Sequence, residues 1–329
     1  MFKKILVPLD GSEHARKILG WATGLAGVLN AEIILLSVID SEEIDILEAT
    51  TRGPDEGSGL TGSNSHGAIG SYVARSPSEV INQAIAQAKH DLYVEARKIQ
   101  SSGVAAKIIV GAGSPAEAIV SVAQSQSADL IAMATRRESA LARGVLGSVT
   151  DRVLHSTSIP ILTLYPGEIH DFSRTSGGPK RVIVPLDGPA LSETAVQPAV
   201  EIAKAAGAEI IFTEILRLPF FGVGVAGIEY GAGDYAGDFG IENQKSDVYE
   251  YLQGFVEDTE ARGLKASASI RTGSPSQQIV EEASQTEDSI VVMGSHGAGG
   301  LKRWVVGSVA DKVIRSAGRP VLVIPPRTG

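Results

Sequence analysis

Three glycines and a serine near the end of the chain, Gly294, Gly297, Gly307 and Ser308, have the spacing of a loop that lies close to a ligand. Glycine lets the backbone approach a bound group without a Cβ in the way. The apolar run that ends at Gly294 predicts a strand, and the residues after Gly307 predict a helix with Ser308 at its N-cap. The loop therefore joins a strand end to a helix N-terminus, where free N–H groups and the helix dipole attract anions. A phosphate is the expected occupant.

Other features of the chain argue against fast phosphate chemistry. The loop lacks the Gly-Lys-Ser/Thr ending of a Walker A motif, and the chain shows no Gly-x-Ser-x-Gly elbow. His296 lies within the loop, but a single histidine there is more often a loop residue than a catalyst. The six histidines form no pair at metal-ligand spacing. We therefore expect binding without fast hydrolysis, no catalytic residue and no resident metal.

The chain repeats one pattern twice. Residues 3–39 align without gaps to residues 180–216, and residues 113–164 align to residues 273–324. A repeat this long indicates duplicated globular domains, and 329 residues are enough for two hydrophobic cores. The predicted units are a first domain at residues 1–168, a linker at 169–179 and a second domain at 180–329.

Short apolar runs alternate with helical patterns in each copy. In the first copy, strands are predicted near residues 3–9, 32–39, 105–110, 129–134 and 159–164. Continuous apolar runs suit strands that are buried on both faces. The alternation predicts a parallel sheet covered by helices on both sides, with ligands at the carboxyl ends of the strands beside a topological switch point.

Serine and proline mark several helix starts. The segments at residues 76–79, 114–117 and 274–277 each combine an N-cap serine, a proline at the first helical position and a glutamate or glutamine two residues later. Pro198 falls inside the first helix of the second copy, so we expect that helix to begin late or to kink.

Composition limits the classes of partner. A net charge of −9 and an aromatic content of 5% argue against a nucleic-acid surface, which needs clustered cations and stacking rings. The absence of cysteine excludes disulfides, thiolate metal sites and cysteine nucleophiles, and fits a reducing compartment. No apolar run approaches the roughly 18 residues that a membrane helix needs, and no signal-peptide pattern is present. We expect a cytoplasmic protein that binds neither nucleic acid nor membranes.

A composite motif carries a resemblance to a known family. The pattern Gly-x-x-Gly, nine residues, Gly-Ser, together with VIVPLDG at residues 182–188, resembles the ATP-binding signature of the universal stress protein family. The resemblance covers nearly the whole chain as two copies. It implies an α/β fold of two tandem five-stranded parallel-sheet domains with strand order 3-2-1-4-5, of the adenine nucleotide alpha-hydrolase-like type. The nucleotide would lie at the ends of strands one and four.

The resemblance also assigns roles to residues of the second copy. Asp187 would accept hydrogen bonds from the ribose or an adenine-side group, and the backbone of Ile215 would contact adenine. Met293 would line the pocket. The phosphate loop and anion seat would be formed by Gly294, Gly297, Gly307, Ser308 and Val309.

The first copy departs from this pattern in its loop. The positions that remain are Asp10, Val38, Gly147 and Ser148. Ala134 stands opposite Gly294, however, and Arg137 stands opposite Gly297. An arginine there either blocks the phosphate path or supplies a charge to an anion. The sequence leaves both an altered nucleotide site and an empty one open.

Three functions agree with these patterns to different degrees. The first is an ATP-binding tandem universal stress protein that acts as a nucleotide-dependent stress-response regulator, with ADP, AMP or a cyclic dinucleotide as other ligands and Mg²⁺ beside the phosphates. The second is a slow ATP hydrolase or autophosphorylating protein, and the third a nucleotide-independent scaffold.

The last strand of each copy is apolar and would leave an exposed sheet edge if it were unpaired. The sequences PILTLYP at residues 160–166 and PVLVIPP at residues 320–326 therefore predict that the two copies pair as an internal pseudo-dimer. A homodimer of whole chains stays open, and no protein partner is indicated.

Overall fold

The computed structural model of the chain describes most of both copies. The described residues are 2–40, 77–135, 146–165, 178–188, 192–216, 234–295 and 306–326. We call the described residues up to Tyr165 the first half and those from Gly178 the second half. Phosphate-loop residues Gly297 and Arg137 lie outside the described residues.

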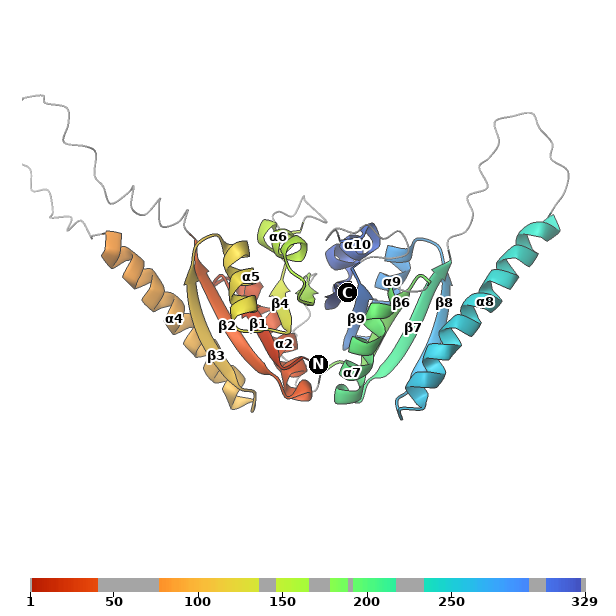
Figure 1. Ribbon diagram of the computed structural model, residues 1–329, viewed down its shortest axis with the longest axis horizontal. Coiled ribbons are helices and arrows are strands. Elements are labelled where there is room, and N and C mark those ends of the chain that lie inside the picture. Colours follow the sequence, from red (N-terminus) through yellow and green to blue (C-terminus); the bar gives the residue numbers. More distant parts are fainter. Residues whose placement is uncertain are drawn as a thin grey trace, which may run out of the picture.

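A single ten-stranded sheet runs through both halves (Figure 1). In order across the sheet, its strands are β3 (Ala106–Ala112), β2 (Glu32–Ile39), β1 (Lys4–Pro8), β4 (Leu130–Ala134), β5 (Ile161–Leu164), β10 (Val321–Ile324), β9 (Ser289–Gly294), β6 (Arg181–Leu186), β7 (Glu209–Leu216) and β8 (Ala266–Thr272).

Each half contributes five parallel strands in the order 3-2-1-4-5, which confirms the implied topology. The halves meet where β5 and β10 pair antiparallel, with Leu322 opposite Leu162 and Val323 opposite Ile161. This confirms the pairing of the last strands. The two expected five-stranded sheets are thus halves of one continuous sheet, because the pairing leaves neither of these strands as an edge.

Helices cover both faces of the sheet. The first face carries α2 (Ile18–Leu29), α4 (Pro77–Ser101), α7 (Val196–Ala206) and α8 (Asp234–Glu260). The second face carries α5 (Pro115–Ser125), α6 (Ser148–Ser156), α9 (Pro275–Ser284) and α10 (Ser308–Ser316). Figure 1 shows α4 and α8 as the outermost helices at the two ends of the sheet. No helix in the described parts of the chain is both long enough and apolar enough to cross a membrane.

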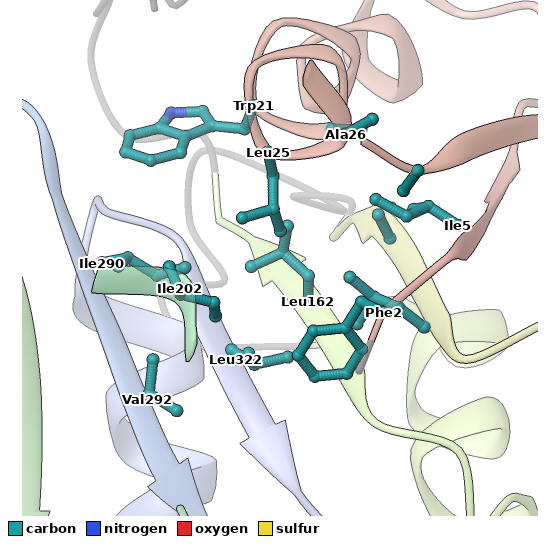
Figure 2. Packing of buried hydrophobic residues seen from close by; sticks show 14 of the residues in the cluster. Phe2, Ile5, Trp21, Leu25, Ala26, Leu162, Ile202, Ile290, Val292 and Leu322 are labelled. Carbon is teal, nitrogen blue, oxygen red and sulfur yellow. The ribbon is translucent and has the colours of Figure 1, made fainter. Parts of the chain in front are cut away.

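The hydrophobic core on the first face continues across the junction between the halves. Figure 2 shows Leu162 of β5 and Leu322 of β10 in this core together with Phe2, Ile202 and Ile290. Helices α2 and α7 also contact each other there. On the second face, Arg315 Nη2 of α10 lies 3.9 Å from Asp151 Oδ1 of α6. The two halves therefore share packing on both faces.

The helix starts agree with the sequence in position but not in hydrogen bonding. Helices α5 and α9 begin at Pro115 and Pro275, with Ser114 and Ser274 as N-caps. Within the described residues, neither serine hydroxyl makes the expected capping hydrogen bond. The Ser114 carbonyl accepts the first helical hydrogen bond, from the Ala118 N–H at 2.9 Å, as the carbonyl of an N-cap residue does. Helix α4 begins at Pro77, and its expected cap, Ser76, lies outside the described residues.

The prediction for Pro198 is confirmed. A short 3-10 helix, η2 (Ser192–Ala195), precedes α7, and Pro198 is the third residue of α7. Proline is tolerated in a first helical turn because its missing N–H would have no helical partner there. The α-helix therefore begins only at Val196, close before the proline.

Candidate functional site

Strands β6 and β9 form a topological switch point in the second half. They lie side by side and parallel, with Val182 opposite Ile290. Strand β6 continues into η2 and α7 on the first face of the sheet, whereas β9 leads to α10 on the second face. The chain thus leaves these two strand ends toward opposite faces of the sheet, and α/β proteins bind ligands at switch points of this kind.

A backbone bridge closes the glycine loop at this switch point. Gly294 is the last residue of β9, and the next residue, Ser295, is buried and donates its N–H to the Ile324 carbonyl at 2.8 Å. The Ser295 carbonyl accepts from the Gly307 N–H at 2.7 Å. The strand end and the helix start are therefore held together, so the loop between them begins and ends at one place.

The N-cap of α10 is Gly307, and the expectation that Ser308 takes this position is wrong. Gly307 has extended backbone angles (φ −62°, ψ 152°), and its carbonyl accepts from the Asp311 N–H at 2.9 Å. Ser308 is the first helical residue and is exposed, and Val309 follows it half-buried. The first N–H groups of a helix have no intrahelical partner. Those of Ser308 and Val309 belong to this set, at the end of the loop.

The remaining predicted residues line the strand ends. Met293 is buried in the core on the second face, and Ile215 of β7 is half-buried against the same core. Asp187 directly follows β6 and is exposed, and its N–H donates to the buried Ser192 hydroxyl at 3.4 Å. The structure thus brings Asp187, Ile215 and Met293 to one edge of the sheet, because parallel strands all end on the same side.

The two equivalent aspartates have different surroundings. In the first half, Asp10 Oδ1 accepts from the Ser12 N–H at 3.0 Å and from the Ser12 hydroxyl at 2.5 Å, as in a local turn. In the second half, Pro189 takes the place of Ser12 and has neither an N–H nor a hydroxyl to donate. Asp10 is therefore held in a local turn by Ser12, and the residue two positions after Asp187 offers no equivalent donor.

Sequence reasoning missed a group of acidic residues beside Asp187. We call Asp187, Glu193, Glu214 and Tyr251 the acidic cluster. Tyr251 of α8 donates its hydroxyl to Glu193 Oε1 of η2 at 3.0 Å. Glu214 of β7 is half-buried, and its buried Oε2 has no hydrogen-bond partner among the described residues. A glutamate inside the apolar run EIIFTEIL was the only signal in the sequence.

Charge interactions within the acidic cluster raise the pKa values of two of its members. Burial, and then the negative charge of Asp187, raise the pKa of Glu214 above its ordinary value. Burial, the hydrogen bond to Glu193 and the negative charges of Glu193, Glu214 and Asp187 raise the pKa of the Tyr251 phenol. The surroundings therefore disfavour the charged forms of Glu214 and Tyr251 and favour their protonated forms.

The first half keeps the general arrangement of strand and helix ends but differs directly after β4. Asp10, Val38, Gly147 and Ser148 lie at the corresponding strand and helix ends, and Ala134 ends β4. The Thr135 carbonyl, which corresponds to the Ser295 carbonyl, lies 2.5 Å from His14 Nε2 of the short helix α1 (Glu13–Arg16). In the first half, the His14 side chain therefore contacts the Thr135 carbonyl. In the second half, the equivalent Ser295 carbonyl accepts from the Gly307 N–H.

No group of three or more His, Cys, Asp or Glu side chains in the described ranges is arranged to hold a metal ion. The acidic cluster therefore differs from a metal centre in its geometry. What the second half offers at the switch point is a set of backbone N–H groups on one side and carboxylate acceptors on the other. Such a site suits a ligand with an anionic end and a hydroxyl-bearing or amino-bearing end.

Comparisons with known proteins agree with this architecture. A sequence model of the Universal stress protein family matches residues 1–164 and again residues 178–325. A universal stress protein of Methanocaldococcus jannaschii is 32% identical over 146 residues, which cover 44% of this chain and 81% of that protein. One from Mycolicibacterium smegmatis is 26% identical over 328 residues, which cover 98% of this chain and 97% of that protein.

A solved structure shows the same fold over the full length. The crystal structure of a universal stress protein from Archaeoglobus fulgidus matches with a TM-score of 0.66 and 24% identity, and the match covers 98% of both chains. The two family matches fall on the two halves of the sheet. The chain therefore belongs to the universal stress protein family, as a tandem of two family domains.

Proposed function

We propose that the second half binds an adenine nucleotide, ATP in the first place, and that its occupancy regulates the protein in a stress response. Family membership supports the stress-response role. The observation that carries the binding proposal is the Ser295–Gly307 backbone bridge, which holds the glycine loop at the N-terminus of α10. A helix N-terminus presented by a closed loop is a site for phosphate groups.

Different residues at the switch point would bind different parts of the nucleotide. The N–H groups of Ser308 and Val309 would bind phosphate oxygens, with Mg²⁺ as their counterion, while the Gly307 N–H stays bonded to the Ser295 carbonyl and holds the start of α10 in place. At the other end, Asp187 would accept hydrogen bonds from ribose hydroxyls and the Ile215 backbone would contact adenine. Met293 and Gly294 would lie under the ligand, and Gly297 would let the loop approach it.

A nucleotide would act on the protein through differential affinity for two states. The loop that binds it connects β9 to α10, and α10 contacts the first half through Arg315 and Asp151. A ligand bound at the N-terminus of α10 would therefore act on the junction between the halves through this helix. We place this regulator in the cytoplasm, and we keep residues 1–168 and 180–329 as its two domains with a linker at 169–179.

The direct test is to count nucleotides. The purified full chain is denatured, and the released nucleotide is identified and quantified by chromatography with mass detection. One ATP or ADP per chain is expected, since the motif is complete only in the second half. Two per chain would mean that Asp10, Val38, Arg137, Gly147 and Ser148 form a working site. None, after titration with added ATP, would overturn the proposal.

A substitution in the loop provides the matched variant. Gly297→Arg copies Arg137 of the first half into the second, and we expect it to weaken ATP binding about a hundredfold, or about 2.7 kcal/mol. Gly254→Arg on the exposed side of α8 adds the same charge and volume away from the switch point and serves as the control. Isothermal titration of both variants measures the difference. Unchanged affinity in Gly297→Arg would contradict the assigned loop.

A further inference from the structure

Glu214 and Asp187 occupy neighbouring positions at the ends of adjacent parallel strands. Glu214 is the register partner of Leu186, and Asp187 is the residue after Leu186. The negative charge of Asp187 acts on Glu214, so the two carboxylates lie near each other at these strand ends. Asp187 is exposed, whereas Glu214 is half-buried and its Oε2 is shielded from water.

The side chain of Glu214 lies on the face of the sheet that α8 covers. Side chains alternate along a strand, so Glu214 shares a face with Phe212 two residues earlier. The Phe212 ring packs against Phe255 of α8, with ring centroids 5.5 Å apart. Phe255 in turn packs edge-on against Tyr251, one helical turn earlier, at 5.2 Å. The same register that places Phe212 beside Phe255 places Glu214 beside Tyr251.

The groups that face Glu214 from the packed elements are acidic, phenolic or apolar. Asp187 acts on it from the end of β6, and Tyr251, whose hydroxyl donates to Glu193 of η2, interacts with it from α8. On β8 the register partner is Ile270, which carries no charge.

Charged groups nearby on the other elements are engaged or turned away. Arg271 of β8 forms its ion pair with Glu282 of α9, on the second face. On α7, Glu201 accepts from the exposed Gln197, and Lys204 is exposed. Negative charge therefore accumulates around Glu214 without a cation opposite it in the described contacts.

The first half has a different charge pattern at the same positions. Ser37 takes the place of Glu214, and Arg16 takes the place of Glu193. Arg16 Nε lies 3.6 Å from Glu95 Oε1 of α4. The concentration of carboxylates is thus a property of the second half alone, the half that keeps the complete glycine motif.

We propose that Glu214 makes nucleotide binding in the second half proton-linked: it takes up one proton from solvent when the anionic nucleotide occupies the switch point. This inference rests on the proposed function. The ligand would contact the backbone of Ile215, the residue after Glu214, so it would cover a carboxylate that is already half-buried and add its own negative charge to that of Asp187 at the switch point. Burial and like charge both favour the neutral carboxyl. The proton adds to a carboxylate oxygen of Glu214, and no other bond changes.

The sign of the pH dependence follows from reciprocity. If the nucleotide raises the proton affinity of Glu214, then protonation of Glu214 raises nucleotide affinity by the same factor. Affinity therefore increases as the pH falls through the range in which Glu214 titrates, which lies above the ordinary range of a glutamate. The steepest slope that one proton allows is about tenfold in affinity per pH unit. Acidification would load the protein with nucleotide.

The experiment compares ATP binding to the wild-type full chain and to Glu214→Gln, which has the same shape and no charge. Titration calorimetry between pH 5 and pH 8, in buffers of different ionisation heat, gives affinity and the number of protons taken up. ATP itself also titrates, but that contribution is common to both proteins. We expect Glu214→Gln to bind more tightly than the wild type at pH 8, to bind equally well at pH 5, and to take up fewer protons.

Two further variants control for indirect effects of the Glu214→Gln substitution. Glu257→Gln removes an exposed charge from α8 and should keep the wild-type pH profile. Glu214→Ser installs the residue of the first half and should behave like Glu214→Gln. If one of the two substitutions perturbs folding, the other still tests the role of the carboxylate. Infrared difference spectra on ATP addition provide an independent readout, a protonated-carboxyl band that is lost in both Glu214 variants.

The outcomes separate this inference from the proposed function. If neither the wild type nor the variants bind ATP at any pH, the proposed function is wrong. If all bind ATP with the same pH profile and the same number of protons, the function stands and the proton linkage of Glu214 is wrong. An affinity of the wild type that falls with decreasing pH relative to Glu214→Gln also overturns it.

Discussion

A single tyrosine joins helix α8 to the short helix that begins after β6. The Tyr251 hydroxyl donates to Glu193 at 3.0 Å, and its ring packs against Phe255. Both partners are half-buried, so the hydrogen bond is sheltered without being sealed from water. A bond of this kind to a charged acceptor stabilises modestly, since water replaces part of it when it is lost.

Tyr251→Phe should therefore destabilise the fold by about 0.5–1.5 kcal/mol, because it removes the hydroxyl and leaves the packing of the ring in place. Urea unfolding followed by circular dichroism measures the change. Tyr249 on the same helix is 54% exposed, and Tyr249→Phe removes a hydroxyl from solvent as the matched control. Equal stabilities of the two variants would show that the bond to Glu193 contributes nothing.

The acidic cluster also explains why part of the site escaped the sequence. Glycine spacing identifies a loop because its members are close in the chain, and the Ser295–Gly307 bridge agrees with it. Glu193, Glu214 and Tyr251 come from three elements, and only the register of β7 against β6 and the packing of α8 bring them together. Ser308 was misplaced by one residue, because Gly307 already has the extended angles and the accepting carbonyl of an N-cap.

At the scale of elements, two equivalent helix ends use different residues for one conformation. Helix α2 ends at Asn30 with φ 51°, and α7 ends at Gly207 with φ 64°. Both are in the left-handed region, which glycine adopts freely and asparagine tolerates. A Cβ on Gly207 would meet no atom within 4 Å. Any cost of a side chain there is therefore a cost of backbone conformation.

Gly207→Ala should cost about 1 kcal/mol for this reason. Gly254 lies within α8, has no positive φ and also has open space around its Cβ position, so Gly254→Ala should stabilise by about 0.5–1 kcal/mol. Thermal or urea unfolding of the two variants compares the same chemical change in opposite backbone settings. Changes of the same sign would contradict the assigned helix end.

Most elements could be predicted because their apolar runs are continuous. The strand predicted at residues 32–39 matches β2, and the run is buried on both faces. The helical segment after β1 divides at Lys17 into α1 and α2. A pattern of apolar spacing does not contain this break, because Ile18, Leu19 and Ala22 stay on the buried side in either case.

At the scale of the whole molecule, the junction is part of the core. Leu322 and Leu162 are register partners across β10 and β5, and both are fully buried. Trp21 lies in the same core as these two leucines (Figure 2). A perturbation of β10 in the second half should therefore be felt by a reporter in the first half.

Leu322→Ala should destabilise by about 2–5 kcal/mol, because it removes buried methyl groups and leaves a cavity. The fluorescence of Trp21 in a Trp304→Phe background reports unfolding of the first half, since these are the only two tryptophans. In Leu322→Ala, we expect the urea midpoint of the Trp21 fluorescence transition to fall by as much as the midpoint of unfolding of the whole chain. An unchanged Trp21 transition would mean that the halves unfold independently.

The covalent union of the halves also changes what substitution can achieve. In a dimer of identical chains, every substitution appears twice and must suit both sites. Here β5 and β10 pair within one chain, so each half can change alone while the junction is kept. Arg137 opposite Gly297, and Ser37 opposite Glu214, are such one-sided changes. The antiparallel junction thus allows one half to change in sequence without a matching change in the other, while the pairing of the two halves is kept.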